Sequence, residues 1–219
     1  MTDIKSFAAT LGSLPSTQMM RIRMVLVALV LSGLTSLAQS NNVNQFEDLK
    51  QPRISAKKSQ KMVVVEAKGD PNVIGGRAFG MVFQLYYRLP ETPKGPPQAF
   101  PRARWPESLE APKTEWTGLY ALPVPETVAQ LPPHETQEGL KASLATWEYG
   151  EVAEILHLGP YSREEPALKR LREFIREQGY VTLGGHEEEY IVGPSQGGKG
   201  DSEQYVTIIR YRVRRPDKK

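Results

Sequence analysis

The chain has 219 residues, 39% of them hydrophobic and 24% charged, which is typical of a soluble protein with one sizeable domain or two small ones. It contains no cysteine, and this excludes disulfides, thiolate metal ligands, a cysteine nucleophile and a lipidated cysteine anchor. The three histidines are scattered, so no histidine-rich metal site is expected and no cofactor is predicted.

The first 40 residues carry a targeting signal. Arg21 and Arg23 precede the apolar run 24–31, and small residues follow at 35–40. These are the basic, apolar and small-residue parts of a secretory signal peptide. The run is shorter than the roughly 20 apolar residues of a transmembrane helix, but an uncleaved signal would still anchor the chain. We expect residues 1–40 to be a signal peptide or N-terminal anchor with extra residues in front, and the protein to be exported, periplasmic or extracellular.

The rest of the chain is expected to be one domain behind a short linker. Residues 41–60 are polar and lack periodicity, which predicts a linker, and residues 61–216 form the predicted domain. Removing the signal takes away more basic than acidic side chains, so the pI near 9.0 overstates the charge of the mature chain. Arg210 and Arg212 alternate along a predicted strand, as on a solvated sheet face. No nucleic-acid partner is expected. Contact with a membrane is expected only if the signal peptide remains uncleaved.

The first half of this domain reads as a strand, a helix and a further strand. A β-branched run predicts a strand at 62–67. Asp70 is an N-cap acceptor and Pro71 suits the first helical position, so a helix begins there. Three glycines either weaken this helix, by up to about 1 kcal/mol each, or allow something to approach its backbone: Gly75, Gly76 and Gly80. A proline-rich excursion separates the helix from a strand predicted at 114–124.

The second half repeats this order more clearly. A strand is predicted at 147–157, and Ser162 is expected to cap a helix that ends near Gly179. The apolar stripe of this helix consists of Leu168, Leu171, Phe174 and Ile175. Further strands are predicted at 181–183 and 187–192, paired as a hairpin about Gly184-Gly185, and at 205–213.

The two halves indicate an internal repeat. Gly69-Asp70-Pro71 and Gly159-Pro160-Tyr161 each lie between a strand and a helix, at an offset of 90 residues. The fold class predicted is therefore α+β, with two pseudo-symmetric strand–helix–hairpin repeats that form a largely antiparallel sheet with two helices. Such a pair leaves a central groove in which a ligand could bind.

The second half also combines several short elements in a fixed order. They are His157-Leu158-Gly159-Pro160-Tyr161, the helix through Leu168 and Leu171, Gly179-Tyr180, Glu188-Glu189-Tyr190, and Thr207-Ile208-Ile209. Together they resemble the GyrI-like (gyrase-inhibitor-like) small-molecule-binding domain, which is also the effector-binding module of bacterial multidrug-responsive transcription activators. The haem-binding SOUL proteins are similar in fold, but no motif here favours haem.

The resemblance covers residues 151–214 and is only architectural over 62–124. It implies a groove in which an acidic residue, here Glu188, helps to bind cationic aromatic ligands between aromatic walls. Some relatives hydrolyse strained, cyclopropane-containing toxins, so the sequence leaves open whether this protein is an enzyme. The chain shows no helix-turn-helix segment ahead of the domain, and with the export signal this argues against a role in transcription.

Strand alternation places Glu188 on the same face as Tyr190, whereas a solvated acidic edge is the plainer interpretation of residues 187–189. Tyr161 either points into the groove or packs over the helix start. The candidate ligand-binding residues are Glu188, Tyr190, Tyr161, Trp116, Tyr120 and His157, the last of which is more often an ordinary core group.

Three functions follow from this sequence. The first is an exported, stand-alone domain that binds a small aromatic or cationic molecule. The second is a hydrolase of strained toxic compounds, in which Glu188 acts with Tyr161 or His157 to activate water. The third is an interaction module of the cell envelope that has no pocket.

Overall fold

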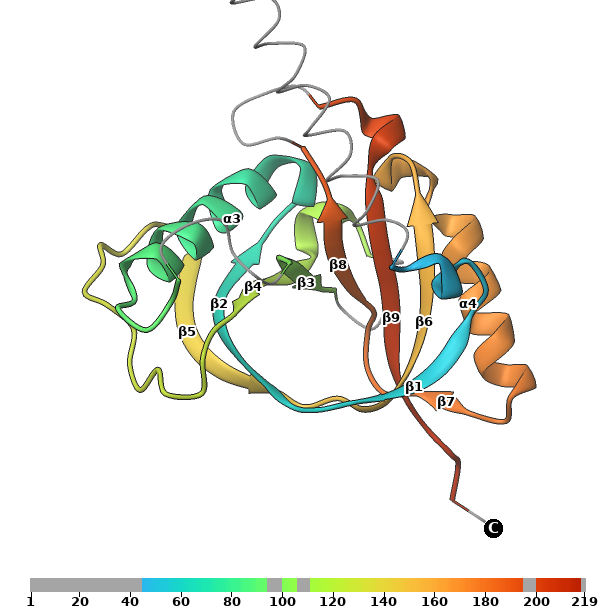
Figure 1. Cartoon of the computed structure of the whole chain (residues 1–219). Coiled ribbons are helices and arrows are strands. Elements are labelled where there is room, and N and C mark those ends of the chain that lie inside the picture. Colours follow the sequence, from blue (N-terminus) through green and yellow to red (C-terminus); the bar gives the residue numbers. More distant parts are fainter. Residues whose placement is uncertain (1–44, 94–99, 106–110, 195–199, 218–219) are drawn as a thin grey trace, which may run out of the picture. The chain divides into compact units, whose positions relative to one another are not determined.

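The structure is a computed structural model that describes residues 45–93, 100–105, 111–194 and 200–217. The predicted signal peptide, residues 1–40, lies outside these ranges. Phe46–Lys219 forms one compact unit, shown in Figure 1, and it contains every feature discussed below. Within the described ranges, no helix combines the length and the apolar character needed to cross a bilayer.

The unit is built on an open, antiparallel sheet of nine strands. The strands are β1 (Arg53–Lys57), β2 (Gln60–Lys68), β3 (Arg102–Arg104), β4 (Thr117–Pro123), β5 (Leu140–Trp147), β6 (Gly150–Leu158), β7 (Val181–Thr182), β8 (Glu187–Val192) and β9 (Val206–Arg214). Their order is β1-β6-β9-β8-β3-β4-β2-β5, with β7 paired to β9. The α+β class predicted from the sequence is confirmed.

Two α-helices pack on the sheet, α3 (Pro71–Arg88) and α4 (Glu165–Glu177). As predicted, Asp70 caps α3: its side chain accepts a hydrogen bond of 2.9 Å from the backbone N–H of Asn72. Ser162 does not cap α4, because it lies in a 3-10 turn and Glu164 occupies the N-cap position. The 3-10 turns are η1 (Glu47–Lys50), η2 (Lys113–Glu115), η3 (Tyr161–Arg163), which contains Ser162, and η4 (Ser202–Gln204).

The two halves share one topology, β2-α3-β3-β4 and β6-α4-β8-β9. At the strand-to-helix turns, the N–H of Gly69 donates to the carbonyl of Trp116 and the N–H of Gly159 to that of Tyr205, each at 2.9 Å. Both glycines have a positive φ, 140° and 107°, which other residues rarely adopt. The predicted repeat is therefore present. The halves meet at the centre of the sheet, where β3 pairs with β8 (Figure 1).

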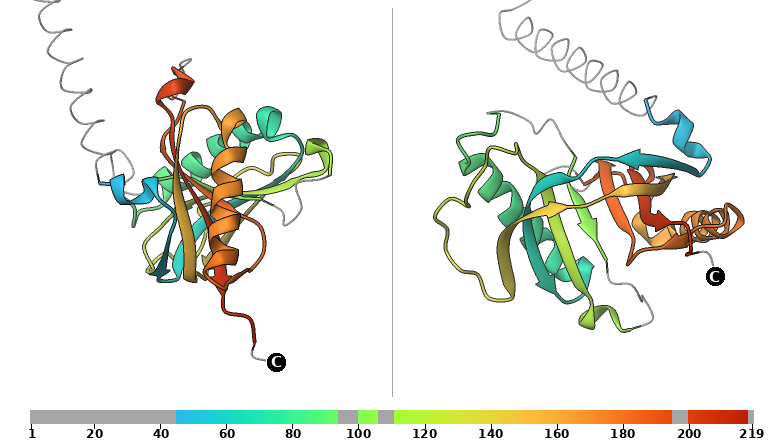
Figure 2. Two further views of the ribbon diagram at one scale, coloured as in Figure 1. Left: turned by 90° about the vertical axis from the view of Figure 1, so that its right-hand side faces the viewer. Right: turned by 90° about the horizontal axis from the view of Figure 1, so that it is seen from below.

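Each half has its own hydrophobic core. Helix α3 buries Val82 and Leu85 completely against β2 and β4, and α4 buries Leu171 against β6 and β9. Figure 2 shows α4 running along its half of the sheet. Complete burial of a leucine or valine side chain stabilises the fold by about 1.5–3 kcal/mol. A third cluster, which contains both Met62 of β2 and Val152 of β6, joins the two halves in addition to the pairing of β3 with β8.

Three strands differ from the sequence prediction. Strand β1 lies inside the segment 41–60 that was predicted to be a linker, and it pairs with β6. Strand β5, residues 140–147, was not predicted at all. The predicted hairpin about Gly184-Gly185 is wrong, because β7 pairs with β9 while β8 pairs with both β9 and β3. In each case the partner strand is distant in sequence or short.

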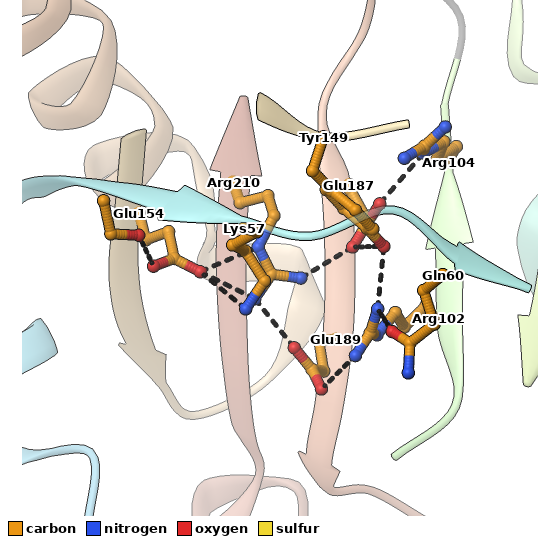
Figure 3. A network of polar contacts seen from close by, with 10 residues as sticks. Lys57, Gln60, Arg102, Arg104, Tyr149, Glu154, Glu187, Glu189 and Arg210 are labelled. Carbon is orange, nitrogen blue, oxygen red and sulfur yellow. Dashed lines mark hydrogen bonds and ion pairs between the residues drawn. The ribbon is translucent and has the colours of Figure 1, made fainter. Parts of the chain in front are cut away.

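A buried network of charges joins the halves on one face of the central strands (Figure 3). Arg210 in β9 is 1% exposed. Its guanidinium contacts three carboxylates, Glu154 at 2.8 Å, Glu187 at 2.6 Å and Glu189 at 2.7 Å. Burial alone lowers the pKa of Arg210, but the charges of these carboxylates outweigh it and raise the pKa. The expectation of a solvated arginine face is thus wrong for Arg210.

Two arginines of β3 complete the network from the other half. Arg102 contacts Glu189 at 3.0 Å and Arg104 contacts Glu187 at 2.9 Å. The hydroxyl of Tyr149 accepts from Arg102 at 2.7 Å and donates to Glu187 at 3.0 Å. Burial raises the pKa of Glu189, but Arg210 and Arg102 outweigh it and lower the pKa. Each of these carboxylates therefore bridges an arginine of the first half and Arg210 of the second.

We expect Arg210→Met to destabilise the domain by about 3–5 kcal/mol, because it leaves three buried carboxylates without their shared cation. Urea unfolding at pH 7 measures the loss. Arg214→Met is the matched control: Arg214 lies four residues further along the same strand and is exposed, so its replacement is expected to change stability by less than about 0.5 kcal/mol. Equal stability of the two variants would contradict the central role of the network.

Candidate ligand-binding groove

A cavity of about 1180 Å³ lies between the two halves on the other face of the central strands. Helix α3 contributes one wall, and the start of α4 with η3 contributes the opposite wall. Residues from β4 and β8 form the base, together with Pro101 and Trp105, which flank β3. The volume exceeds the upper end of the usual range for small-molecule sites, about 300–1,000 Å³. The expected central groove is therefore present.

Glu188 lies at the base of this groove. It is 6% exposed, which excludes the solvated-edge interpretation. The Tyr190 hydroxyl donates to its Oε2 at 2.7 Å, and Nε2 of His186 lies 3.0 Å from its Oε1. Strand alternation directs the neighbouring Glu187 and Glu189 to the opposite face, where they join the charge network.

Glu164, at the N-cap of α4, is a second buried carboxyl in the groove and is also 6% exposed. Burial, and then the charge of Glu188 and a hydrogen bond with it, raise the pKa of Glu164 to about 9. At neutral pH Glu164 therefore keeps its proton and donates to the Glu188 carboxylate. Two adjacent carboxyl groups that share one proton are an arrangement suited either to holding a cation or to acid–base chemistry.

Aromatic side chains form a continuous row across both halves. The Tyr190 ring makes edge contacts with Tyr161, at 5.4 Å between centroids, and with Phe79, at 5.5 Å. From Phe79 the row continues through Tyr120, at 5.1 Å, to Trp105, at 5.7 Å. Trp116 ends it, 6.0 Å from Trp105. Burial and then the charge of Glu188 raise the pKa of Tyr161 and of Tyr190, so both phenols stay protonated at neutral pH.

The glycines of α3 open the helix toward the groove. Gly75, Gly76 and Gly80 all line the cavity. A Cβ atom at Gly76 or Gly80 would meet nothing within 4 Å, and one at Gly75 would lie 3.6 Å from the Tyr120 ring. Each glycine makes the helix less stable than alanine would, by about 1 kcal/mol, but leaves its backbone surface available for close contact with a flat molecule.

The structure brings five of the six predicted site residues to this groove: Glu188, Tyr190, Tyr161, Trp116 and Tyr120. His157 does not line it, because the ring is buried and its Nε2 lies 3.1 Å from the carbonyl oxygen of Pro160. In the part of the chain described, no group of three or more His, Asp or Glu side chains could hold a metal ion.

The groove residues that sequence reasoning missed include Phe79, Trp105, Glu164 and His186. The alternation that found Glu188 and Tyr190 also predicts the same face for His186, two residues earlier. Glu164 was not singled out, because an acid at the start of a helix is an ordinary stabilising feature there. Trp105 lies in the proline-rich excursion, where no pattern gave its direction.

Comparisons with known proteins identify the fold. No protein-family model and no curated protein matches the sequence. An uncharacterized conserved protein from Listeria innocua is 18% identical, with 80% of this chain and 98% of that chain covered and a TM-score of 0.62. A hydrolase from Listeria innocua is 16% identical, with coverage of 80% and 98% and a TM-score of 0.57.

The C-terminal domain of EcmrR is 15% identical, with 76% of this chain and 98% of that domain covered and a TM-score of 0.56. At these identities the likeness shows a shared fold, and that fold is consistent with the GyrI-like resemblance of the sequence motifs.

We expect Glu164→Gln to stabilise the domain increasingly as pH rises. The folded-state pKa of Glu164, about 9, lies above its ordinary 4.5, so the protonated acid loses stability as pH rises between these values, whereas glutamine does not titrate. The difference in unfolding free energy between variant and wild type should grow by on the order of 3 kcal/mol from pH 5 to pH 8. Urea titrations at both pH values measure it. Glu177→Gln, on the exposed end of α4, is the control, and a pH-independent difference for Glu164→Gln would contradict the assignment.

Proposed function

We propose that this protein binds a small aromatic organic cation in the groove between its halves. The observation that carries the proposal is the buried Glu188 carboxylate at the base of a large cavity walled by aromatic rings from both halves. A carboxylate withdrawn from water attracts a cation more strongly than an exposed one does, because the dielectric screening is lower. The GyrI-like motifs and the shared fold support the same conclusion.

The aromatic row supplies the rest of the affinity. A cation over a tyrosine or tryptophan ring gains about 0.5–2 kcal/mol. Tyr190 donates to Glu188 and contacts the Tyr161 ring, so these two rings would flank the charge. Trp105 and Trp116 would extend the wall for the apolar part of the ligand. The open backbone at Gly76 and Gly80 leaves room for a planar ring system beside α3. We also propose that the N-terminal signal exports the domain, so that it acts outside the cytoplasm.

A hydrolase is the second candidate, and one observation favours it. Glu164, as a carboxylic acid, stands beside Glu188, and Tyr161 lines the same cavity. Glu188 could take a proton from water while Glu164 protonates the leaving group, as general acid–base catalysis requires. His157 has no part in this scheme, because it lies outside the cavity. The hydrolase-named protein from Listeria innocua shares the fold alone.

Two matched probes test the binding proposal: N-methylquinolinium, and its neutral isostere 1-methylnaphthalene. Isothermal titration of the mature domain is expected to show tighter binding of the cation. Glu188→Gln should weaken the cation at least about tenfold, equivalent to about 1.4 kcal/mol, and leave the neutral probe nearly unchanged. Glu177→Gln, outside the groove, should leave the affinity of both probes unchanged.

A second variant tests the free volume of the groove without changing its charge. Gly80→Leu fills the groove without touching a carboxylate, and Leu is the better helix former, so the fold should remain stable while both probes bind more weakly. The proposal fails if Glu188→Gln binds the cation as tightly as the wild type does.

A further inference from the structure

A second, smaller cavity of about 140 Å³ lies on the opposite face of the sheet from the groove. Glu187 and Arg210, whose side chains point to that face, line it, together with Arg104 and Arg212. The turn Gly184-Gly185 adds backbone with no side chain, which leaves the cavity open to solvent. The proposed ligand groove does not use this cavity.

The charges around this cavity are unequal. The ion-paired network contains four cationic side chains, Lys57, Arg102, Arg104 and Arg210, and three carboxylates, Glu154, Glu187 and Glu189. Arg210 is surrounded by all three carboxylates. The cations that remain incompletely neutralised are therefore those at the edge of the network, where Arg104 lies (Figure 3). Arg104 also lines the cavity.

Arg104 is held rigidly but its hydrogen-bonding capacity is mostly unused. Its Nε donates to Glu187, and its guanidinium lies over the Trp147 ring, 4.0 Å from the centroid. A guanidinium has five N–H donors. Among the described residues, the two Nη atoms of Arg104 have no acceptor, and Nη2 is buried. The side chain remains 21% exposed, so a small molecule can reach the group.

Arg212 brings a second positive charge to the same cavity. Its side chain is half-buried, and no acidic partner for it occurs in the part of the chain that the structure describes. The carboxylate of Glu187, which also lines the cavity, is already bound by Arg210, Arg104 and Tyr149. Two guanidinium groups that share a cavity with one committed carboxylate repel each other unless an anion lies between them.

We propose that this cavity binds a small oxyanion, a phosphate or a carboxylate group, between Arg104 and Arg212. The fork of N–H donors in a guanidinium matches the paired oxygens of such a group. The volume, about 140 Å³, is several times the roughly 30 Å³ of a liquid water molecule and accommodates one such group. The stacking of Arg104 on Trp147 fixes the donor plane in advance.

The test uses inorganic phosphate and acetate as probes, each at 20 mM, with sodium chloride at equal ionic strength as reference. Thermal unfolding of the mature domain should show a rise in Tm of about 2 °C or more with at least one oxyanion and none with chloride. Comparison of phosphate with acetate shows whether the site prefers the tetrahedral or the planar oxyanion.

Arg212→Gln removes one side of the site without touching the buried network, and it should abolish the rise in Tm. Arg176→Gln, an exposed arginine on α4, removes the same charge elsewhere and should leave the rise intact. Arg104→Lys keeps the charge but loses the planar fork, and should lose most of the rise. A rise that chloride reproduces, or that Arg212→Gln retains, overturns the proposal. If Arg104→Lys does not fold, the comparison of Arg212→Gln with Arg176→Gln decides the matter.

Discussion

The pairing of β3 with β8 is the constraint on which the rest of the structure depends. Three residues of the first half, Arg102-Ala103-Arg104, lie opposite Glu189, Glu188 and Glu187 of the second half. This short ladder and the ion pairs around it join the two half-cores, together with the hydrophobic cluster that contains Met62 of β2 and Val152 of β6. Under the repeat, Arg102 corresponds to Glu187 and Arg104 to Glu189. Two identical halves would therefore place like charges face to face, and only unlike halves can pair in this way.

The same ladder positions residues of both proposed sites. Because side chains alternate along a strand, Glu188 enters the groove while its two neighbours enter the charge network on the other face. The network neutralises Glu187 and Glu189 with arginines, but Glu188 meets only the short side chain of Ala103 across the ladder. Its carboxylate has no arginine partner and contacts only Tyr190, His186 and Glu164 among the described residues, so we expect it to be available to a ligand.

Local signals predicted what is local in this fold. The capped helix after Asp70, the glycine turns at the two strand-to-helix junctions and the repeat between them could all be predicted from sequence, since each depends on residues within a few positions of one another. The central ladder could not. Strand β3 has three residues inside a proline-rich segment, too few to show alternation, and its partner lies about 85 positions away.

The sequence predictions that failed at the site also concern contacts between residues that are distant in the sequence. Glu188 and Tyr190 were found because alternation along one strand gave their face, whereas the importance of Glu164 depends on a contact between a helix start and a strand that no pattern in sequence reveals. The predicted hairpin failed because Gly184-Gly185 resembles a two-residue turn, although the strand after it pairs with β3 and β9. Arg210 was expected in water because alternating arginines usually are, and only the three converging carboxylates explain its burial.

Ala103 lies at the position that mirrors Glu188, and this difference gives the groove an electrical direction. Among the described residues, every carboxyl group that lines the groove belongs to the second half, namely Glu164, Glu165 and Glu188, whereas the first half contributes Lys113. The two halves share one topology but present different charged groups to the groove. A molecule with one positive end, bound as proposed, would therefore lie in a single orientation, and a symmetric dication would leave its second charge beside a lysine. This difference makes the two walls distinguishable to whatever binds between them.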